Sequence, residues 1–317
     1  MMQDRLGVLI TYYNERNLLH ECLSSLLGQK TRPSEIIVYD DASTHPAEEY
    51  IPAGVRIPVI RGDVNRGPAC GRNALLRASR SDYVHFHDAD DLFDPRWCKS
   101  VANIIQGSAP DAIFTEVSSY KDGQLESDRV LGLKHLLNGE DLVRFCIRGA
   151  MLPAAGTYRR QRVLAIGGYR EQLWQSEDFD FHVRLAASGI RYTVIDDPLV
   201  AIRIRSCSRS QNHEEVWSSA LEAIRFLAKE IDPHYRSDLA HKAARAGSIL
   251  FRAGARQKAR VAFRTAQELG PPSYYGERSL YGFIARLFGP QAAESFGLIY
   301  RRFVSESGRR YLAERGW

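Results

Sequence analysis

Short apolar runs alternate with helical patterns along the first part of the chain, and each run ends in a polar turn. The runs lie at residues 6–10, 35–39 and 82–86, with apolar residues at helical spacing between them. This alternation favours an α/β fold with a mainly parallel sheet. Because ligands bind beyond the carboxyl ends of such strands, we expect the polar turns to meet at one edge of the sheet.

The strand patterns stop after about residue 211, and amphipathic helical patterns take over. Before that point, further strands are predicted at residues 55–60, 112–117, 192–195 and 199–204, and a helix is predicted at 139–146. We therefore predict two domains, an α/β domain at residues 1–211 and an all-helical domain at residues 212–317.

The charge is divided unevenly between these parts. The whole chain has 43 Lys and Arg against 38 Asp and Glu, a net charge of +5. Residues 235–317 hold fifteen basic and six acidic residues, which leaves a net charge of −4 for residues 1–234.

No apolar run is long enough for a membrane-spanning helix, no signal peptide is indicated, and the five cysteines lack a disulfide or metal-binding pattern. We expect a cytoplasmic protein.

Apolar residues at helical spacing, bordered by arginines, characterise residues 280–312. Such a face packs inside a helical domain or lies peripherally on an anionic membrane surface, and the sequence leaves both open. Packing is the simpler interpretation, whereas membrane contact would suit a lipid-linked acceptor. No nucleic-acid-binding module accompanies the basic charge, so nucleic acid is not an expected partner.

Two carboxylates, Asp88 and Asp90, follow the strand at residues 82–86. Oxygen ligands at this spacing suit Mg²⁺ or Mn²⁺ shared with a substrate diphosphate. Asp-rich turns also occur without any ligand, because the Asp side chain bonds its own backbone. The spacing alone therefore leaves a metal site and a polar turn open.

Six motifs in order distinguish these alternatives. They are Thr-Tyr-Tyr-Asn-Glu at 11–15, Val-Tyr-Asp-Asp-Ala-Ser at 38–43, Asn-Arg-Gly-Pro-Ala-Cys-Gly-Arg-Asn at 65–73, His-Asp-Ala-Asp-Asp at 87–91, Gly-Gly-Tyr at 167–169 and Glu-Asp at 177–178. Together they resemble the landmarks of family-2 glycosyltransferases, over about residues 4–210. The resemblance implies a GT-A fold, an inverting reaction and a nucleotide-sugar donor.

The resemblance also implies roles for individual residues. The implied donor-nucleotide contacts are Thr11, Tyr13, Glu15, Asp40, Asp41, Arg66, Arg72 and Asp88. Asp41 matches the position that bonds the base of a UDP donor, and Asp40 is its neighbour. Asp90 matches the ligand of a divalent ion on the donor diphosphate, with Asp88 near the ribose and the metal.

The resemblance makes Asp178 the catalytic base and gives Glu177 an orienting role. An inverting transfer needs a carboxylate opposite the leaving diphosphate to take the proton of the acceptor hydroxyl. Acidic residues also favour the first turn of a helix for electrostatic reasons alone, so the pair has a structural interpretation as well.

Two features depart from the family pattern or narrow it. Arg205 stands where many members have a histidine, so its charge could stabilise the diphosphate and weaken the dependence on metal. The Gln-x-x-Arg-Trp motif of processive synthases is missing, because Val261 follows Arg260. We expect one sugar to be transferred per encounter.

These observations predict an inverting, metal-dependent glycosyltransferase that uses a UDP-sugar and Mn²⁺ or Mg²⁺. The acceptor would be a glycan, a lipid-linked molecule or another hydroxyl compound in polysaccharide, lipopolysaccharide or other glycoconjugate biosynthesis. Two alternatives stay open at this point, a non-catalytic glycosyltransferase-like binding module and a nucleotidyltransferase.

Overall fold

The computed structural model describes residues 4–121, 123–149, 151–205, 212–270 and 280–303. It divides into two compact units, unit 1 at Met1–Ser208 and unit 2 at Arg209–Trp317. The predicted boundary between residues 211 and 212 lies at the edge of a segment outside the described residues.

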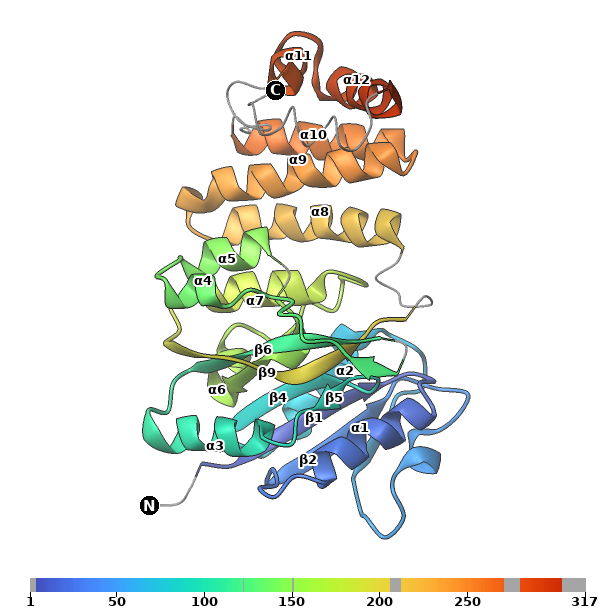
Figure 1. The fold of residues 1–317 in the computed structure, drawn as a ribbon, viewed down its shortest axis with the longest axis vertical. Coiled ribbons are helices and arrows are strands. Elements are labelled where there is room, and N and C mark those ends of the chain that lie inside the picture. Colours follow the sequence, from blue (N-terminus) through green and yellow to red (C-terminus); the bar gives the residue numbers. More distant parts are fainter. Residues whose placement is uncertain (1–3, 122, 150, 206–211, 271–279, 304–317) are drawn as a thin grey trace. The chain divides into compact units, whose positions relative to one another are not determined.

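Unit 1 is an α/β fold built on a mixed sheet (Figure 1). The strands are β1 (Leu6–Tyr12), β2 (Glu35–Asp40), β3 (Val59–Arg61), β4 (Tyr83–Asp88), β5 (Leu92–Phe93), β6 (Ala112–Lys121), β7 (Gln124–Leu125), β8 (Gly156–Arg159) and β9 (Tyr192–Arg203). The helices are α1 (Asn17–Leu27), α2 (Pro68–Ala78), α3 (Trp97–Gly107), α4 (Lys134–Leu137), α5 (Leu142–Arg148), α6 (Arg160–Ala165) and α7 (Glu177–Ala187), with 3₁₀ turns η1 (Ala47–Tyr50) and η2 (Pro153–Ala155). The described strands run in the order β3-β2-β1-β4-β8-β6-β9-β5, and β7 pairs with β6.

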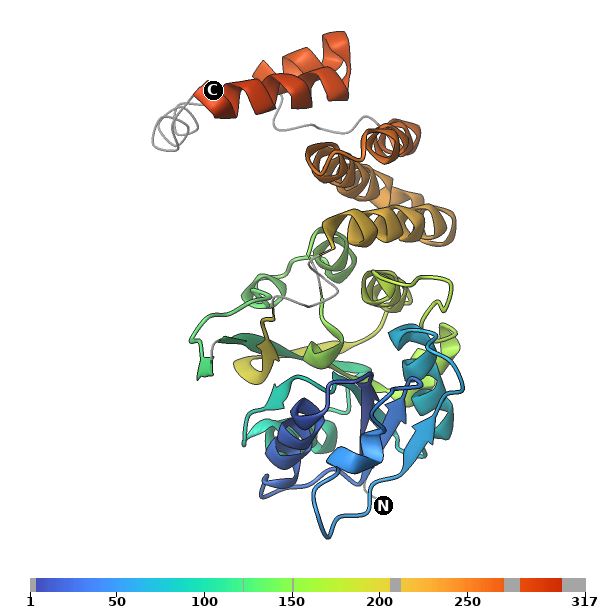
Figure 2. The same cartoon turned by 90° about the vertical axis from the view of Figure 1, so that its right-hand side faces the viewer.

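The first four strands form the parallel part of the sheet, in the order β3-β2-β1-β4. Strand β1 is central, and Val8, Leu9 and Ile10 are fully buried, as expected for a strand covered on both faces. Helices α1 and α2 lie on opposite faces (Figure 2), because the connection through α1, from β1 to β2, and the connection through α2, from β3 to β4, run in opposite directions along the sheet. The carboxyl ends of β1, β2 and β4 therefore share one edge.

The second half of the sheet differs from the mainly parallel prediction. Strand β8 inserts antiparallel between β4 and β6, and β5 pairs antiparallel with β9. The two strands predicted at residues 192–195 and 199–204 are one strand, β9, with a register shift opposite Glu116 of β6. The strand predicted at 55–60 is the shorter β3, and the helix predicted at 139–146 is α5, which Asp141 caps through the N–H of Arg144.

A buried carboxylate holds the irregular part of this sheet. Glu116 is fully buried, and its side-chain oxygens accept hydrogen bonds from the backbone N–H groups of Val117, Leu131 and Leu133 at 3.1, 2.7 and 2.9 Å. These bonds fix the loop that follows β7 against β6 where the pairing with β9 shifts register. The bonds compensate the cost of burying a charged group.

Unit 2 is helical. Its described elements are α8 (His213–Glu230), η4 (Pro233–Tyr235), α9 (Arg236–Arg252), α10 (Arg256–Leu269), α11 (Leu280–Phe288) and α12 (Pro290–Phe303). Helices α9 and α10 approach closely at Gly247, where a β-carbon would lie 2.7 Å from the ring of Phe263.

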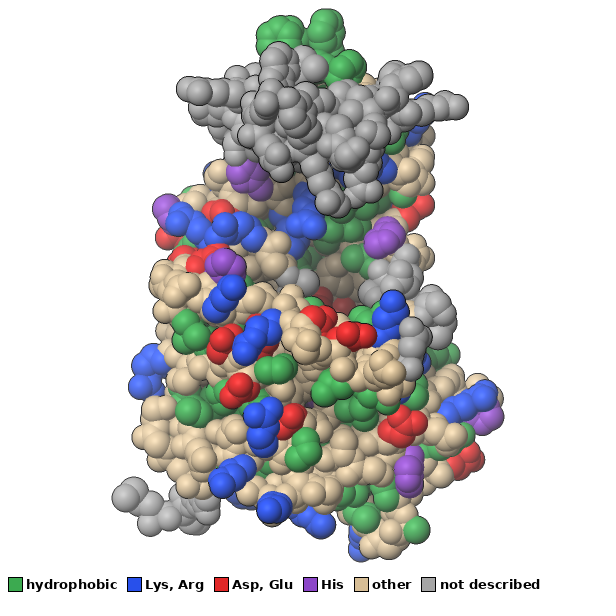
Figure 3. All heavy atoms as spheres, viewed as in Figure 1, with side chains coloured by type: hydrophobic (Ala, Val, Ile, Leu, Met, Phe, Trp, Pro, Cys, Tyr) green, Lys and Arg blue, Asp and Glu red, His purple; other side chains and the backbone are tan. Residues whose placement is uncertain are grey.

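On α11, Phe283, Leu287 and Phe288 are exposed, and Figure 3 shows apolar side chains at this end of the unit. No described helix combines the length and the apolar character needed to cross a membrane.

Replacing Glu116 with Ala is expected to lower the free energy of unfolding by about 3 kcal/mol, because two buried N–H groups and one half-buried N–H group lose their acceptor. Chemical denaturation of the two proteins measures the difference. Glu126→Ala, on the same hairpin but exposed, is the control and should change stability by less than about 0.5 kcal/mol. Equal effects of the two substitutions would show that Glu116 does not hold the loop.

Candidate active site

The ends of β1, β2 and β4 bring the first motifs together, as the strand order predicts. Thr11 lies beside Asp88 across the β1–β4 pair, and Tyr12 lies beside Asp40 across the β1–β2 pair. The hydroxyl of Thr11 donates a hydrogen bond to Asp88 Oδ1 at 3.0 Å. Asp88 is thus fixed from the neighbouring strand.

Arg72 of α2 connects two acidic motifs that are far apart in the sequence. Its guanidinium is buried; Nη2 lies 2.8 Å from Asp88 Oδ1 and Nη1 lies 2.7 Å from Glu177 Oε1. The same guanidinium lies 5.2 Å from the ring centre of Tyr169. The structure therefore gives Arg72 a bridging position between carboxylates, and the donor contact implied by the resemblance stays a prediction.

Glu177 and Asp178 begin helix α7. The preceding Ser176 has left-handed backbone angles, with φ 57° and ψ 19°, an uncommon conformation for a residue other than glycine. Burial, with the nearby charge of Glu177, raises the pKa of the Asp178 carboxyl to about 7. The neighbouring carboxylates thus differ in environment, because Glu177 is paired with Arg72 whereas the pKa of Asp178 lies near neutral pH.

Two residues that the sequence did not single out hold the backbone of Asp178. His182 Nδ1 lies 2.7 Å from the carbonyl oxygen of Asp178, and His182 Nε2 lies 2.7 Å from the hydroxyl of Tyr158. Burial lowers the pKa of His182 to about 3, so the ring is neutral at physiological pH. A neutral ring that donates to the carbonyl from Nδ1 accepts from Tyr158 at Nε2. Only the position of His182, one helical turn after Asp178, hinted at this contact.

Asp41 lies where the loop before α2 approaches β2. Its carboxylate accepts the backbone N–H groups of Arg66 and Gly67 at 2.9 and 2.8 Å. Gly67 has a φ of 83° and leads into Pro68 at the start of α2. A β-carbon on Gly67 would lie 3.1 Å from the ring of Trp174, an exposed residue that the sequence analysis also passed over. The Arg66 side chain is exposed and pairs with Glu171 at 3.2 Å.

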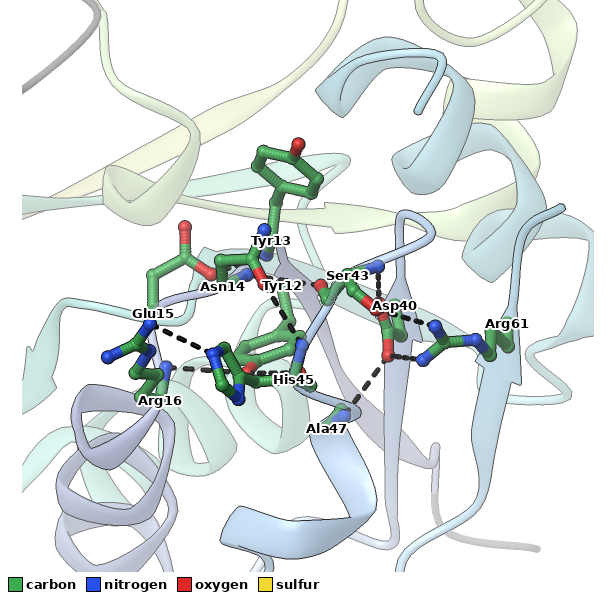
Figure 4. Close-up of polar contacts among 10 residues, drawn as sticks. All are labelled: Tyr12, Tyr13, Asn14, Glu15, Arg16, Asp40, Ser43, His45, Ala47 and Arg61. Atoms are coloured by element: carbon green, nitrogen blue, oxygen red, sulfur yellow. Dashed lines mark hydrogen bonds and ion pairs between the residues drawn. The ribbon is translucent and has the colours of Figure 1, made fainter. Parts of the chain in front are cut away.

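Asp40 occupies a different environment from Asp41. Figure 4 shows its carboxylate directed toward the N–H groups of Ser43 and Ala47 and toward Arg61. The side chain is fully buried, and both oxygens accept hydrogen bonds within the protein. Asp40 therefore holds the turn after β2, and the donor contact implied for it stays a prediction.

The first motif forms an irregular turn between β1 and α1. Asn14 and Arg16 both have positive φ, and the Tyr13 side chain is exposed and projects away from the Asp40 network (Figure 4). The backbone N–H of Tyr13 donates to the Glu15 carboxylate. Burial raises the pKa of Glu15 to about 8, and the charge of Asp90 contributes to the shift. This turn and the end of β4 thus belong to one electrostatic environment.

Asp90 is paired with Arg205, which follows β9 by two residues. Arg205 Nη2 lies 2.5 Å from Asp90 Oδ2. Among the described residues, no group of three or more His, Cys, Asp or Glu side chains is arranged to hold a metal ion. The oxygen chemistry of Asp90 and Asp88 fits Mg²⁺ or Mn²⁺ only if further oxygen ligands come from elsewhere, as a donor diphosphate would supply.

Sequence comparisons identify the family of the chain. Residues 7–164 match the family model described as Glycosyl transferase family 2. The chain belongs to glycosyltransferase family 2. Among curated relatives, it is 26% identical over 228 residues to the succinoglycan biosynthesis protein ExoU of Rhizobium meliloti (strain 1021), covering 66% of this chain and 65% of ExoU. The chain spans 61 to 65% of the length of the first three relatives that it matches.

Solved glycosyltransferase structures share the fold. This family 2 glycosyltransferase matches S. aureus TarS 1–349 in complex with UDP-GlcNAc with a TM-score of 0.72 and 19% identity, over 94% of this chain and 92% of TarS. It matches the mannosyltransferase PcManGT from Pyrobaculum calidifontis, in complex with GDP-Man and Mn²⁺, with a TM-score of 0.57 and 17% identity, over 96% and 88% of the two chains. The GT-A fold predicted from the motifs is therefore confirmed.

Replacing Arg72 with Met is expected to destabilise this glycosyltransferase by about 3–5 kcal/mol, because two carboxylates lose their shared cation. Arg72→Lys should recover part of the loss, since a single ammonium cannot bridge both partners with the same geometry. Thermal and chemical unfolding measure the effect. The exposed Arg77→Met is the control, and similar losses for Arg72 and Arg77 would refute the bridge.

Proposed function

We propose that this family 2 glycosyltransferase moves one sugar per encounter from a nucleotide-sugar donor to an acceptor hydroxyl, with inversion at the anomeric carbon. The observation that carries the proposal is the Arg72 bridge, because it holds Asp88 of the donor motif next to the start of α7, where Asp178 lies. The nucleotide sugars named for TarS and PcManGT support this class of donor.

Donor binding is proposed at the ends of β1, β2 and β4. Asp41, held by two backbone N–H groups, is the proposed partner of the base of a UDP donor. Thr11, Tyr13 and Glu15 belong to the turn beside it. The exposed side chain of Arg66 lies on the same loop as the Asp41 contacts and supplies positive charge for the phosphates.

A divalent ion, Mn²⁺ or Mg²⁺, is part of the proposal. Asp90 would hold it together with the donor diphosphate, with Asp88 nearby. When bound, such an ion neutralises the charge that develops on the leaving nucleoside diphosphate. The Mn²⁺ named for PcManGT supports this assignment.

Asp178 is the proposed catalytic base. With a pKa of about 7, its carboxyl is ionised in about half of the molecules at neutral pH and is more basic than an ordinary aspartate. The acceptor oxygen forms a bond to the anomeric carbon while the bond from that carbon to the diphosphate oxygen breaks. The electron pair leaves with the nucleoside diphosphate, and the hydroxyl proton goes to Asp178. Glu177, held by Arg72, orients Asp178 or the acceptor.

The acceptor is proposed to be a glycan, a lipid-linked molecule or another hydroxyl compound of glycoconjugate biosynthesis. The name of the succinoglycan biosynthesis relative supports a role in glycan synthesis. A cytoplasmic location and contact of the C-terminal helices with a membrane surface stay predictions.

A panel of UDP- and GDP-sugars tests the proposal. The full chain with Mn²⁺ is expected to bind UDP and to release it from at least one UDP-sugar, measured by calorimetry and by detection of the free nucleoside diphosphate. Binding without release from any donor, even with a mixed set of hydroxyl acceptors, would favour a non-catalytic module. Preference for GDP would contradict the role given to Asp41.

The pH dependence of transfer tests Asp178. Because the base must be ionised, kcat/KM should rise with pH through about 7 and level off above it. Asp178→Asn should lower the rate by about 10²-fold or more while donor binding is retained. The exposed Glu49→Gln is the control, and full transfer by Asp178→Asn would refute the assignment.

Thermal unfolding gives a second measurement on the same variant. The folded protein raises the pKa of Asp178, so ionisation of this carboxyl costs stability, and the cost is complete above the folded value of about 7. Asp178→Asn should therefore unfold at a higher temperature than the wild type at pH 8. The difference should shrink as the pH falls below 7.

A further inference from the structure

Arg205 binds the second carboxylate of the Asp88–Asp90 motif across the sheet edge. Its Nη2 lies 2.5 Å from Asp90 Oδ2, and both side chains are partly buried, with exposed fractions of 30% and 18%. A charge-assisted contact of this length is strong when its partners are shielded from water. The contact joins the end of β9 to the turn after β4.

The residue two places earlier fixes this end of β9. The backbone N–H of Arg203 donates to Asp91 Oδ1, and its Nε donates to the carbonyl oxygen of Asp90, both at 2.9 Å. Its Nη2 pairs with Glu21 at 2.7 Å, and its guanidinium lies 4.7 Å from the ring centre of Tyr120. Arg205 therefore extends from a strand end that is already bound to the acidic turn.

The protein thus supplies a separate guanidinium for each aspartate of the motif. Arg72 pairs with Asp88 and Arg205 pairs with Asp90. Glu15 lies within electrostatic range of both Asp90 and Arg205. Arg205 is therefore the nearest described countercharge of the carboxylate to which the proposed function gives the metal ion.

We infer that Arg205 is a built-in cation that competes with a divalent metal ion for Asp90. An ion such as Mg²⁺ binds a carboxylate oxygen at about 2.0–2.1 Å, close to the place where the guanidinium of Arg205 lies. Two cations at this separation repel each other, so the metal binds tightly only when Arg205 gives up Oδ2. The protein free of nucleotide then has low affinity for the metal, and the displaced guanidinium is free to face the donor diphosphate.

This inference deepens the proposed function and rests on its assignment of the metal to Asp90. Its test uses Mn²⁺ alone, with neither nucleotide nor transfer, so the two proposals fail separately. Electron paramagnetic resonance of free Mn²⁺ gives the dissociation constant for the metal-stripped full chain. Removing the guanidinium in Arg205→Ala or Arg205→Gln should tighten Mn²⁺ binding by about fivefold or more.

Matched variants separate competition from a general effect of charge. Arg205→Lys keeps the positive charge and should stay within about twofold of the wild type, as should Arg96→Ala, which removes one positive charge from an exposed pair with Asp94. Adding Asp90→Asn to Arg205→Ala should abolish the gain. Circular dichroism confirms that each variant is folded.

Either of two results would overturn the inference. The first is that neither Arg205→Ala nor Arg205→Gln binds Mn²⁺ more tightly than the wild type. Failure of all three proteins to bind Mn²⁺ measurably counts as this result. The other is a gain in affinity that survives Asp90→Asn, because the competing site would then not be Asp90.

Discussion

The buried guanidinium of Arg72 is the interaction on which the arrangement of the site depends. Burying a charged group is costly unless it is paired and hydrogen-bonded, and Arg72 meets this condition only because Asp88 and Glu177 reach it from two separate elements. Neither element can move away without leaving an uncompensated charge. The end of β4 and the start of α7 are therefore held together by electrostatics as well as by packing, although they lie far apart in the chain.

The same contact explains why two adjacent carboxylates can have different chemistry. Glu177 is paired with Arg72, whereas desolvation and the charge of Glu177 raise the pKa of Asp178 to about 7. A general base works best when its pKa lies near the working pH. His182, which is held by Tyr158, fixes the carbonyl of the same residue, and the Asp178 carboxylate accepts the backbone N–H of Phe179 at Oδ1.

The sequence predicted the parts of this molecule that depend on local pattern. The apolar runs located β1, β2 and β4, and the order of the acidic motifs placed Thr11 and Asp88 at one sheet edge. The antiparallel insertion of β8 and the single long β9 could not be predicted, because they depend on pairing between distant segments. The resemblance favoured Asp41 over its neighbour Asp40 as a donor ligand, but the sequence did not show which groups each carboxylate binds in the fold. The structure distinguishes them by their partners. Asp40 binds Arg61 and the backbone N–H of Ala47, whereas Asp41 binds the loop before α2.

The arginines of the site were recognised as positive charges, but their partners could not be predicted. Arg72 and Arg205 both form ion pairs with carboxylates of the protein, so neither is an unpaired positive charge available to a phosphate. The donor diphosphate proposed for this acidic edge needs more positive charge than Arg66, which is paired with Glu171, supplies on its own. In the proposed function, binding therefore exchanges partners, with a metal ion taking over a carboxylate or an arginine leaving one. Arg72 is too deeply buried for such an exchange, whereas Arg205 is partly exposed at the end of a strand. The difference in burial thus favours a structural role for the Arg72–Asp88 pair and an exchange of partners, as inferred above, for the Arg205–Asp90 pair.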